Sequence, residues 1–153
     1  MKQPTKRYCI GVDPGRNTGV AVYDRQTDDI ILARTVGFWA LFREVLSHYP
    51  PDQADVIVED ARLNKPTFAK ENDAGDRKRE KISRNVGSVQ AESRLIIEGL
   101  RLMGYNVKAI RPLGEKWDAR TVERITGYSG RISEHARDAI RFCYGVKFIR
   151  YDT

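Results

Sequence analysis

Cysteine and histidine are both scarce in this sequence: each occurs only twice in 153 residues. Cys9 and Cys143 lie inside apolar segments, and the Cys and His residues do not have the spacing of a zinc site. The pattern excludes a disulfide framework and a zinc knuckle. It indicates two buried thiols in a reducing compartment.

Long apolar runs are absent as well. No stretch approaches the roughly 18 residues of a membrane span, and the opening MKQPTKRYCIG lacks the apolar region of a signal peptide. We see no internal repeat and no low-complexity segment. We therefore expect a soluble, cytoplasmic protein with one domain over residues 1–153, long enough to bury a sizeable core.

Charge of one sign dominates. The chain has 27 Lys and Arg against 21 Asp and Glu, a formal net charge of +6. The segment Arg62–Arg84 contains eight basic and four acidic residues, so it supplies +4 of this excess. Such a surplus favours a polyanionic partner, nucleic acid before membrane.

Apolar periodicity predicts an α/β protein in the order three strands, helix, strand, helix, strand, helices. DVIVE, ending at Glu59, has three consecutive apolar residues, which indicates a strand buried on both faces of a sheet. We expect a mixed five-stranded sheet flanked by helices, with a meander first and crossovers after it. The expected strands are Tyr8–Asp13, Thr18–Tyr23, Ile30–Val36, Asp55–Glu59 and Val107–Ile110; the expected helices are Trp39–Tyr49, Asn85–Met103, Asp118–Ile125 and Ser133–Arg150.

Two acids stand where their strands end, Asp13 in the first and Glu59 in the fourth. If these strands are parallel neighbours, both carboxylates emerge at the edge of the sheet where α/β folds bind ligands. The alternative is that Asp13 only caps a Pro-Gly turn and Glu59 pairs with a surface lysine.

The stretch RISEHARDAIRF raises the same question for the last helix. On a helical projection His135 lies within the broad apolar face, and Asp138 lies at its border, about 60° away. Glu134 precedes Asp138 by one turn. These residues form either a satisfied core histidine beside a salt-bridged edge, or part of a site.

Asp13, Glu59, His135 and Asp138, if they converge, suit hard divalent cations. Magnesium prefers oxygen ligands, and two such ions about 4 Å apart activate water and neutralise the leaving oxygen in phosphodiester hydrolysis. Histidine is an atypical magnesium ligand, but it tolerates manganese or serves as a general base. The chemistry indicates a nuclease.

These residues lie in motifs that resemble the RuvC-type Holliday-junction resolvase family of the RNase H-like superfamily. Actin-like and sugar kinases share the first hairpin, but they lack the final acid-bearing helix of so short a chain. Lys116–Arg131 and the compact length resemble phage-encoded members. The matching stretches are GVDPGRNTGVAV (Gly11–Val22), VIVED (Val56–Asp60), GSVQAESRLIIEGL (Gly87–Leu100) and EHARDAI (Glu134–Ile140).

The resemblance implies an RNase H-like fold and a catalytic, metal-binding set of Asp13, Glu59, His135 and Asp138. Many members have aspartate at the position of His135, so its role as ligand or base stays open. It also implies two Mg²⁺ per active site, with Mn²⁺ as a substitute. The implied protein is a homodimer in a bacterial cell that binds four-way DNA junctions and makes paired nicks.

In such proteins the loop and helix after the second acid face the junction and the dimer partner. Phe68 is the one aromatic residue there and stacks at the crossover by this resemblance, or it simply anchors the loop to the body. The expected DNA-binding residues are Lys65, Phe68, Lys70, Arg77, Lys78, Arg79, Lys81 and Arg84.

Other functions fit part of the same pattern. A broader branched-DNA or flap nuclease and an RNA-processing nuclease share the fold and the acids. A catalytically silent junction-binding module shares the basic segment, although all four site positions being present argues against it. A sugar-kinase-like phosphotransferase fits only the first hairpin, because the sequence lacks a second glycine-rich phosphate loop.

Overall fold

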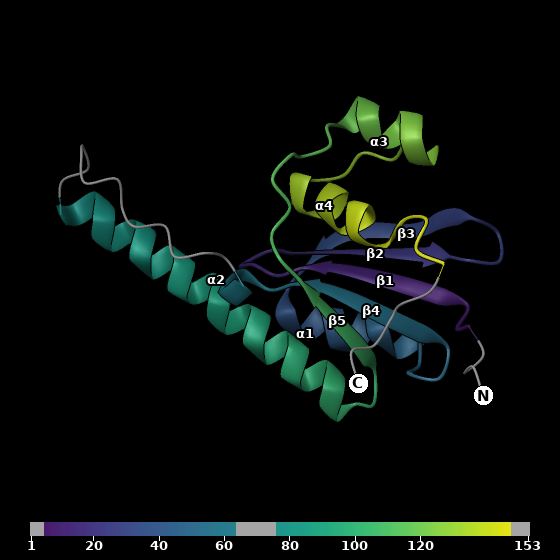
Figure 1. Ribbon diagram of the computed structural model, residues 1–153, viewed down its shortest axis with the longest axis horizontal. Helices are drawn as coiled ribbons and strands as arrows, with labels where there is room; N and C mark the ends of the chain where they lie inside the picture. The colour runs from purple at the N-terminus through teal and green to yellow at the C-terminus, as the bar shows by residue number, and fades with distance from the viewer. Residues whose placement is uncertain (1–4, 64–75, 148–153) are drawn as a thin grey trace.

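The computed structural model describes residues 5–63 and 76–147, excluding the side chains of residues 76–83 and 85. It contains one mixed five-stranded sheet in the order β3-β2-β1-β4-β5 (Figure 1). The strands are β1 (Tyr8–Asp13), β2 (Thr18–Asp24), β3 (Asp29–Val36), β4 (Ala54–Glu59) and β5 (Asn106–Ile110). All five agree with the predicted strands to within one residue at either end, so the α/β class with a mixed sheet flanked by helices is confirmed.

Strand direction changes at the middle of the sheet. β1, β2 and β3 are joined by hairpins and pair antiparallel, whereas β4 and β5 pair parallel to β1 and to each other. Hairpins suit the short connections between the first strands, and parallel pairing needs the longer helical crossovers that follow. The carboxyl ends of β1, β4 and β5 therefore meet at one edge of the sheet.

Alternating side chains build a core on each face of the sheet. On one face, residues such as Ile10, Val22 and Val58 pack against α1 (Phe38–Ala40), the following π turn (Leu41–Val45) and 3-10 turn (Leu46–His48), and α2 (Asp76–Leu102). On the other face, Cys9 and Ile57 pack against α3 (Ala119–Thr126) and α4 (Glu134–Cys143). The period of two follows from the pleat of a strand.

Helix α2 is longer than predicted. It begins at Asp76, nine residues before the predicted Asn85, so the end of the basic segment is helical rather than a loop. Arg, Lys and Glu are strong helix formers, so this part of the chain favours a helix by propensity. It has no apolar stripe, which is the pattern by which a helix that packs on a sheet is predicted. Figure 1 shows this first part of α2 extending past the sheet.

Helix α4 is shorter than predicted. It ends at Cys143 rather than near Arg150, because Gly145 adopts a positive φ of 75° and Tyr144 closes the last turn on Ile140. The predicted helix Asp118–Ile125 is confirmed as α3, with Asp118 as its N-cap, whereas the predicted helix Trp39–Tyr49 is α1 continued by a π turn and a 3-10 turn. No helix in the described ranges is long and apolar enough to cross a membrane.

Candidate active site

Asp13 and Glu59 are neighbours at one edge of the sheet. β1 and β4 run parallel, with Val12 opposite Val58, so the next residue of each strand is an acid. By the pleat, both carboxylates point to the face that α4 covers, as Cys9 and Ile57 do. The prediction that the two acids share an edge is therefore confirmed.

Helix α4 lies directly on the β1–β2 hairpin. A Cβ added at Gly19 would come 2.0 Å from the carbonyl oxygen of His135, and one at Gly11 would come 2.1 Å from that of Ala139. Only glycine permits this approach of two backbones. Ser133 caps the helix by accepting a hydrogen bond from the amide of Ala136. These contacts fix the first turn of α4 above the end of β1.

His135 and Asp138 occupy the helix differently from the prediction. The His135 side chain is 47% exposed, whereas that of Asp138 is 12% exposed. His135 belongs to the first turn, at the edge of the sheet, where solvent reaches it. Asp138 lies one turn further along the helix, where neighbouring residues bury most of its side chain at the wall of the cleft. The expectation that His135 lies within the apolar face and Asp138 at its border was wrong.

The four predicted residues line one cleft of about 670 Å³. Nδ1 of His135 lies 3.1 Å from Oδ2 of Asp13, which joins α4 to β1. Apolar residues, among them Val89, Leu113 and Phe142, form part of the wall. The ionisable residues that line the cleft are Asp13, Arg16, Glu59, Lys116, His135, Asp138 and Arg141.

Lys116 is the main residue that the sequence reasoning missed. It lies in the loop between β5 and α3, where its Nζ donates a hydrogen bond to Oε1 of Glu134 and lies 3.7 Å from Oδ2 of Asp138. A single lysine in a polar loop has no distinguishing pattern. Only the folded chain brings it to the acids of α4.

Burial and mutual repulsion control the protonation of the two strand-end acids. Burial raises the pKa of Asp13 to about 6, with the charge of Asp138 adding to the rise and the hydrogen bond from His135 opposing it. Burial also raises the pKa of Glu59 to about 7, and the charges of Asp13 and Asp138 add to this. The cleft therefore holds carboxylates that gain from an additional nearby cation.

The donor set suits a hard divalent cation, because three carboxylates and one imidazole face the cleft. Across residues 5–63 and 76–147, no three His, Cys, Asp or Glu side chains are already arranged to hold a metal ion. Three of the four candidate ligands have contacts within the protein: Asp13 and His135 lie 3.1 Å apart, and Asp138 lies 3.7 Å from Nζ of Lys116. A metal ion would have to compete with these contacts.

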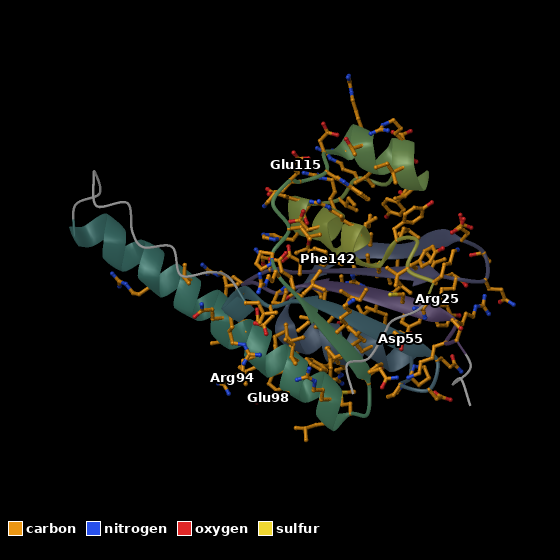
Figure 2. The ribbon with its side chains drawn as sticks, viewed as in Figure 1. Arg25, Asp55, Arg94, Glu98, Glu115 and Phe142 are labelled. Atoms are coloured by element: carbon orange, nitrogen blue, oxygen red, sulfur yellow. The ribbon has the colours of Figure 1, made fainter. Side chains whose placement is uncertain are left out.

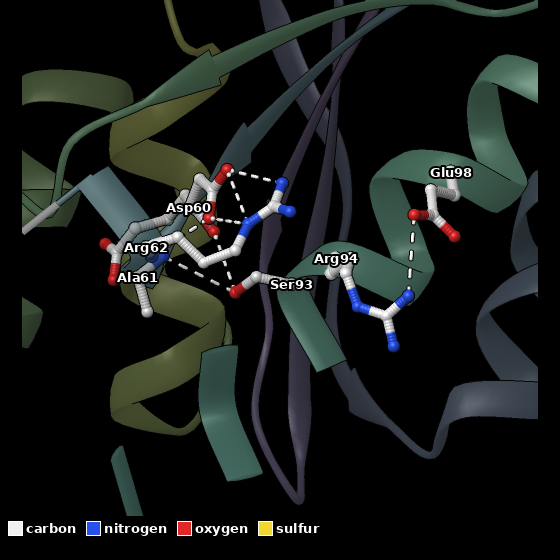
Figure 3. A network of polar contacts seen from close by, with 7 residues as sticks. Asp60, Ala61, Arg62, Ser93, Arg94 and Glu98 are labelled. Carbon is white, nitrogen blue, oxygen red and sulfur yellow. Dashed lines mark hydrogen bonds and ion pairs between the residues drawn. The ribbon is translucent and has the colours of Figure 1, made fainter. Parts of the chain in front are cut away.

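A polar network fixes the end of β4 against α2 (Figure 3). The Ser93 hydroxyl donates to the carbonyl of Glu59 and accepts from the amide of Ala61. Asp60 is buried and accepts three side-chain hydrogen bonds from Arg62, so it has a structural partner, and it does not line the cleft.

The predicted DNA-binding residues are described only in part. Arg84 is exposed on α2, one turn before Ser88 at the cleft. Arg77, Lys78, Arg79 and Lys81 belong to α2, but their side chains lie outside the described part of the chain. Lys65, Phe68 and Lys70 lie outside the described residues altogether. Instead, Arg16 and Arg141 emerge as basic residues of the cleft itself.

Comparison with known proteins adds no family assignment: the chain matches no protein-family model, and it matches no curated protein.

Proposed function

We propose that this protein is a metal-dependent, structure-specific endodeoxyribonuclease that resolves four-way DNA junctions, with an RNase H-like fold. One observation carries the proposal: Asp13, Glu59, His135 and Asp138 come from three separate elements and line a single cleft. Such a convergence of acids is expected for a catalytic site and is costly for a structural one, since buried carboxylates repel one another.

The carboxylates of Asp13, Glu59 and Asp138 are the residues that would hold divalent cations. Two Mg²⁺ or Mn²⁺ ions bound there would supply activation of water and neutralisation of the leaving oxygen. His135 contacts Asp13 and is about half exposed, so it is able either to bind a cation or to accept a proton from water. The raised pKa values of Asp13 and Glu59 support a site completed by positive charge.

Basic side chains around the acids support a nucleic-acid substrate. Arg16 comes from the β1–β2 turn, Lys116 from the loop before α3, and Arg141 from α4, so cations border the cleft on several sides. Such cations bind phosphates on either side of a scissile bond. The basic segment Arg62–Arg84 would supply further positive charge for the arms of a branched substrate.

The outer face of α2 supports the homodimer that paired nicking needs. Ala91, Leu95 and Leu102 recur at spacings of four and seven residues, and Leu95 and Leu102 are 45% and 88% exposed. An apolar stripe on the solvent side of a helix is typical of a surface that packs against a second helix. A second copy of α2 is the simplest partner for it.

Cleavage of an end-labelled mobile four-way junction tests the proposal. The reaction contains Mg²⁺ or Mn²⁺, with linear duplex and flap DNA as controls, and the Asp138→Asn variant run in parallel. We expect symmetric nicks in the junction alone, absent from the variant. Metal-dependent cutting of flaps and junctions alike would replace the proposal with a broader branched-DNA nuclease. Binding without any cutting would leave a junction-binding module.

A further inference from the structure

Lys116 stands between two acids of α4 that serve different purposes. Glu134 and Asp138 are one helical turn apart, so one lysine side chain reaches both. Its Nζ donates to Glu134 Oε1 and stays 3.7 Å from Asp138 Oδ2, beyond hydrogen-bonding distance. In this arrangement the ammonium is held mainly by the acid outside the cleft.

The two acids differ in exposure. The Glu134 side chain is 51% exposed and does not line the cleft, whereas that of Asp138 is 12% exposed and does. Lys116 itself is 57% exposed and lines the cleft. An ammonium ion that moved fully onto Asp138 would take up the carboxylate that faces Asp13 and Glu59. It would thereby occupy the position of a competing cation.

We propose that Glu134 is a positioning residue that draws Lys116 away from Asp138 and so keeps this carboxylate available to a divalent cation. The inference rests on the proposed function, because it concerns the metal affinity of that site. Glu134 acts only through Lys116: it holds the ammonium at the rim, where the positive charge still faces the cleft. Without Glu134, Lys116 turns to Asp138 and becomes an internal competitor of the metal.

Three features make this more than a surface ion pair. The lysine is shared by a residue inside the cleft and one outside it. Its charge also acts on Asp13 and Glu59, so its position matters to the whole group of acids. Finally, Lys116 Nζ already lies 3.7 Å from Asp138 Oδ2, so a small shift of the ammonium decides whether this carboxylate stays available to a cation.

Isothermal titration calorimetry of the protein with Mn²⁺ measures the metal affinity without relying on cleavage. Glu134→Gln is expected to weaken Mn²⁺ binding roughly two- to fivefold, the equivalent of one exposed ion pair. Lys116→Gln is expected to bind Mn²⁺ more tightly than the unchanged protein does. The double variant is expected to match Lys116→Gln, because Glu134 has no ammonium left to hold. Far-UV circular dichroism checks that each variant is folded.

The outcomes separate this inference from the proposed function. If the unchanged protein does not bind Mn²⁺, or if Asp138→Asn binds it equally well, both the metal site and the inference fail. If Asp138→Asn abolishes binding but Glu134→Gln has no effect, the metal site stands and the inference fails. If Glu134→Gln weakens Mn²⁺ binding and the same weakening persists when Lys116 is also replaced, Glu134 acts on the metal directly and the positioning role is overturned.

Discussion

The imidazole of His135 and the carboxylate of Asp13 are joined by a 3.1 Å contact between Nδ1 and Oδ2, across 122 positions of the sequence. The contact connects the first turn of α4 with the end of β1, and it lowers the pKa of a carboxyl that burial would otherwise raise further. It joins a strand-end acid of the candidate site directly to a residue of the helix that covers it.

Replacing His135 with alanine is therefore expected to raise the pKa of Asp13 above its value of about 6. The variant loses a hydrogen bond to the ionised carboxylate, while the burial of that carboxylate on β1 is retained. Carbon-13 NMR of labelled aspartate side chains measures the titration directly. An unchanged midpoint for Asp13 would show that the contact does not form in solution.

The acids of the cleft should make the metal-free protein less stable as the pH rises. The pKa values of Asp13 and Glu59 are about 6 and 7 in the folded chain, above their ordinary values of 3.8 and 4.5. At a pH between the ordinary pKa and the raised pKa of each acid, that acid is more often protonated in the folded state than in the unfolded state. The contribution of Asp13 and Glu59 to the free energy of unfolding therefore falls as the pH rises from about 4 to about 7.

The Asp13→Asn variant removes part of this effect. At pH 7.5 without divalent cations, we expect its free energy of unfolding to exceed that of the unchanged protein by about 1 to 2 kcal/mol. At pH 4 the two should be nearly equal. Urea denaturation at the two pH values checks this. Asp28→Asn is the control of opposite sign, because hydrogen bonds from Tyr23 and Lys147 lower the pKa of Asp28. A less stable Asp13→Asn variant at pH 7.5 contradicts the prediction.

The glycines under α4 give a second test of the site's construction. Gly19→Ala would place a Cβ 2.0 Å from the carbonyl oxygen of His135 and must push the first turn of α4 off the hairpin. We expect a loss of about 3 kcal/mol or more in stability, in the upper range for overpacking, because the clash is with backbone. Gly37→Ala is the matched control, since its Cβ would meet no atom within 4 Å. Thermal unfolding of the two variants compares them, and equal melting temperatures would argue against the close approach.

The strands and the shared edge of Asp13 and Glu59 were predictable from sequence because each depends on a local pattern, whereas the addition of His135 and Asp138 to this set rested on the family resemblance. Alternating apolar runs end at Asp13 and Glu59, and parallel pairing then brings both acids to one edge. The position of Lys116 was not predictable, since a loop lysine carries no periodicity. The exposure of His135 was misjudged because a helical projection gives a direction around the axis. The projection does not show that the first turn of α4, which holds His135, lies at the edge of the sheet and is open to solvent.

The start of α2 shows a similar limit. Sequence periodicity registers a helix through the apolar stripe that it buries, and Asp76–Arg84 has no such stripe. The final helix was overestimated for the converse reason: apolar residues continue past Gly145, but a positive φ at that glycine ends the helix. Single glycines decided both the length of α4, through the positive φ of Gly145, and its closeness to the sheet, through the missing Cβ atoms of Gly11 and Gly19.

A buried ion pair secures the end of the sheet opposite the cleft (Figure 2). Nη1 of Arg25 lies 2.8 Å from Oδ2 of Asp55, with the two side chains 6% and 8% exposed. Arg25 also donates to the carbonyls of Tyr8 and Val146, so it connects three segments. Arg25→Ala is expected to lower the free energy of unfolding by about 3 to 5 kcal/mol, because it removes the cation from a buried carboxylate.

The exposed pair of Arg34 and Glu44 is the control for this experiment. Their side chains are 49% and 59% exposed and the closest charged atoms are 3.6 Å apart, so Arg34→Ala should lower stability by less than about 1 kcal/mol. Urea denaturation of both variants measures the difference. Similar losses in the two variants would mean that burial of the Arg25 pair does not determine its contribution.

The outer stripe of α2 predicts how the protein associates. Leu95→Asp combined with Leu102→Asp would place two charges in each copy of the proposed helix pair. We expect the dimer to weaken by more than about a hundredfold, equivalent to roughly 3 kcal/mol. Sedimentation velocity at micromolar concentration should then show a monomer.

Ile31→Asp is the control, since Ile31 is as exposed as Leu95, at 45%, but lies on β3. If the unchanged protein is itself a monomer, or if Ile31→Asp dissociates the dimer and the α2 variant does not, this face of α2 is not the interface. The proposed paired nicking would then have to be organised by the DNA, because two separate monomers would cleave the opposing strands of a junction independently of each other.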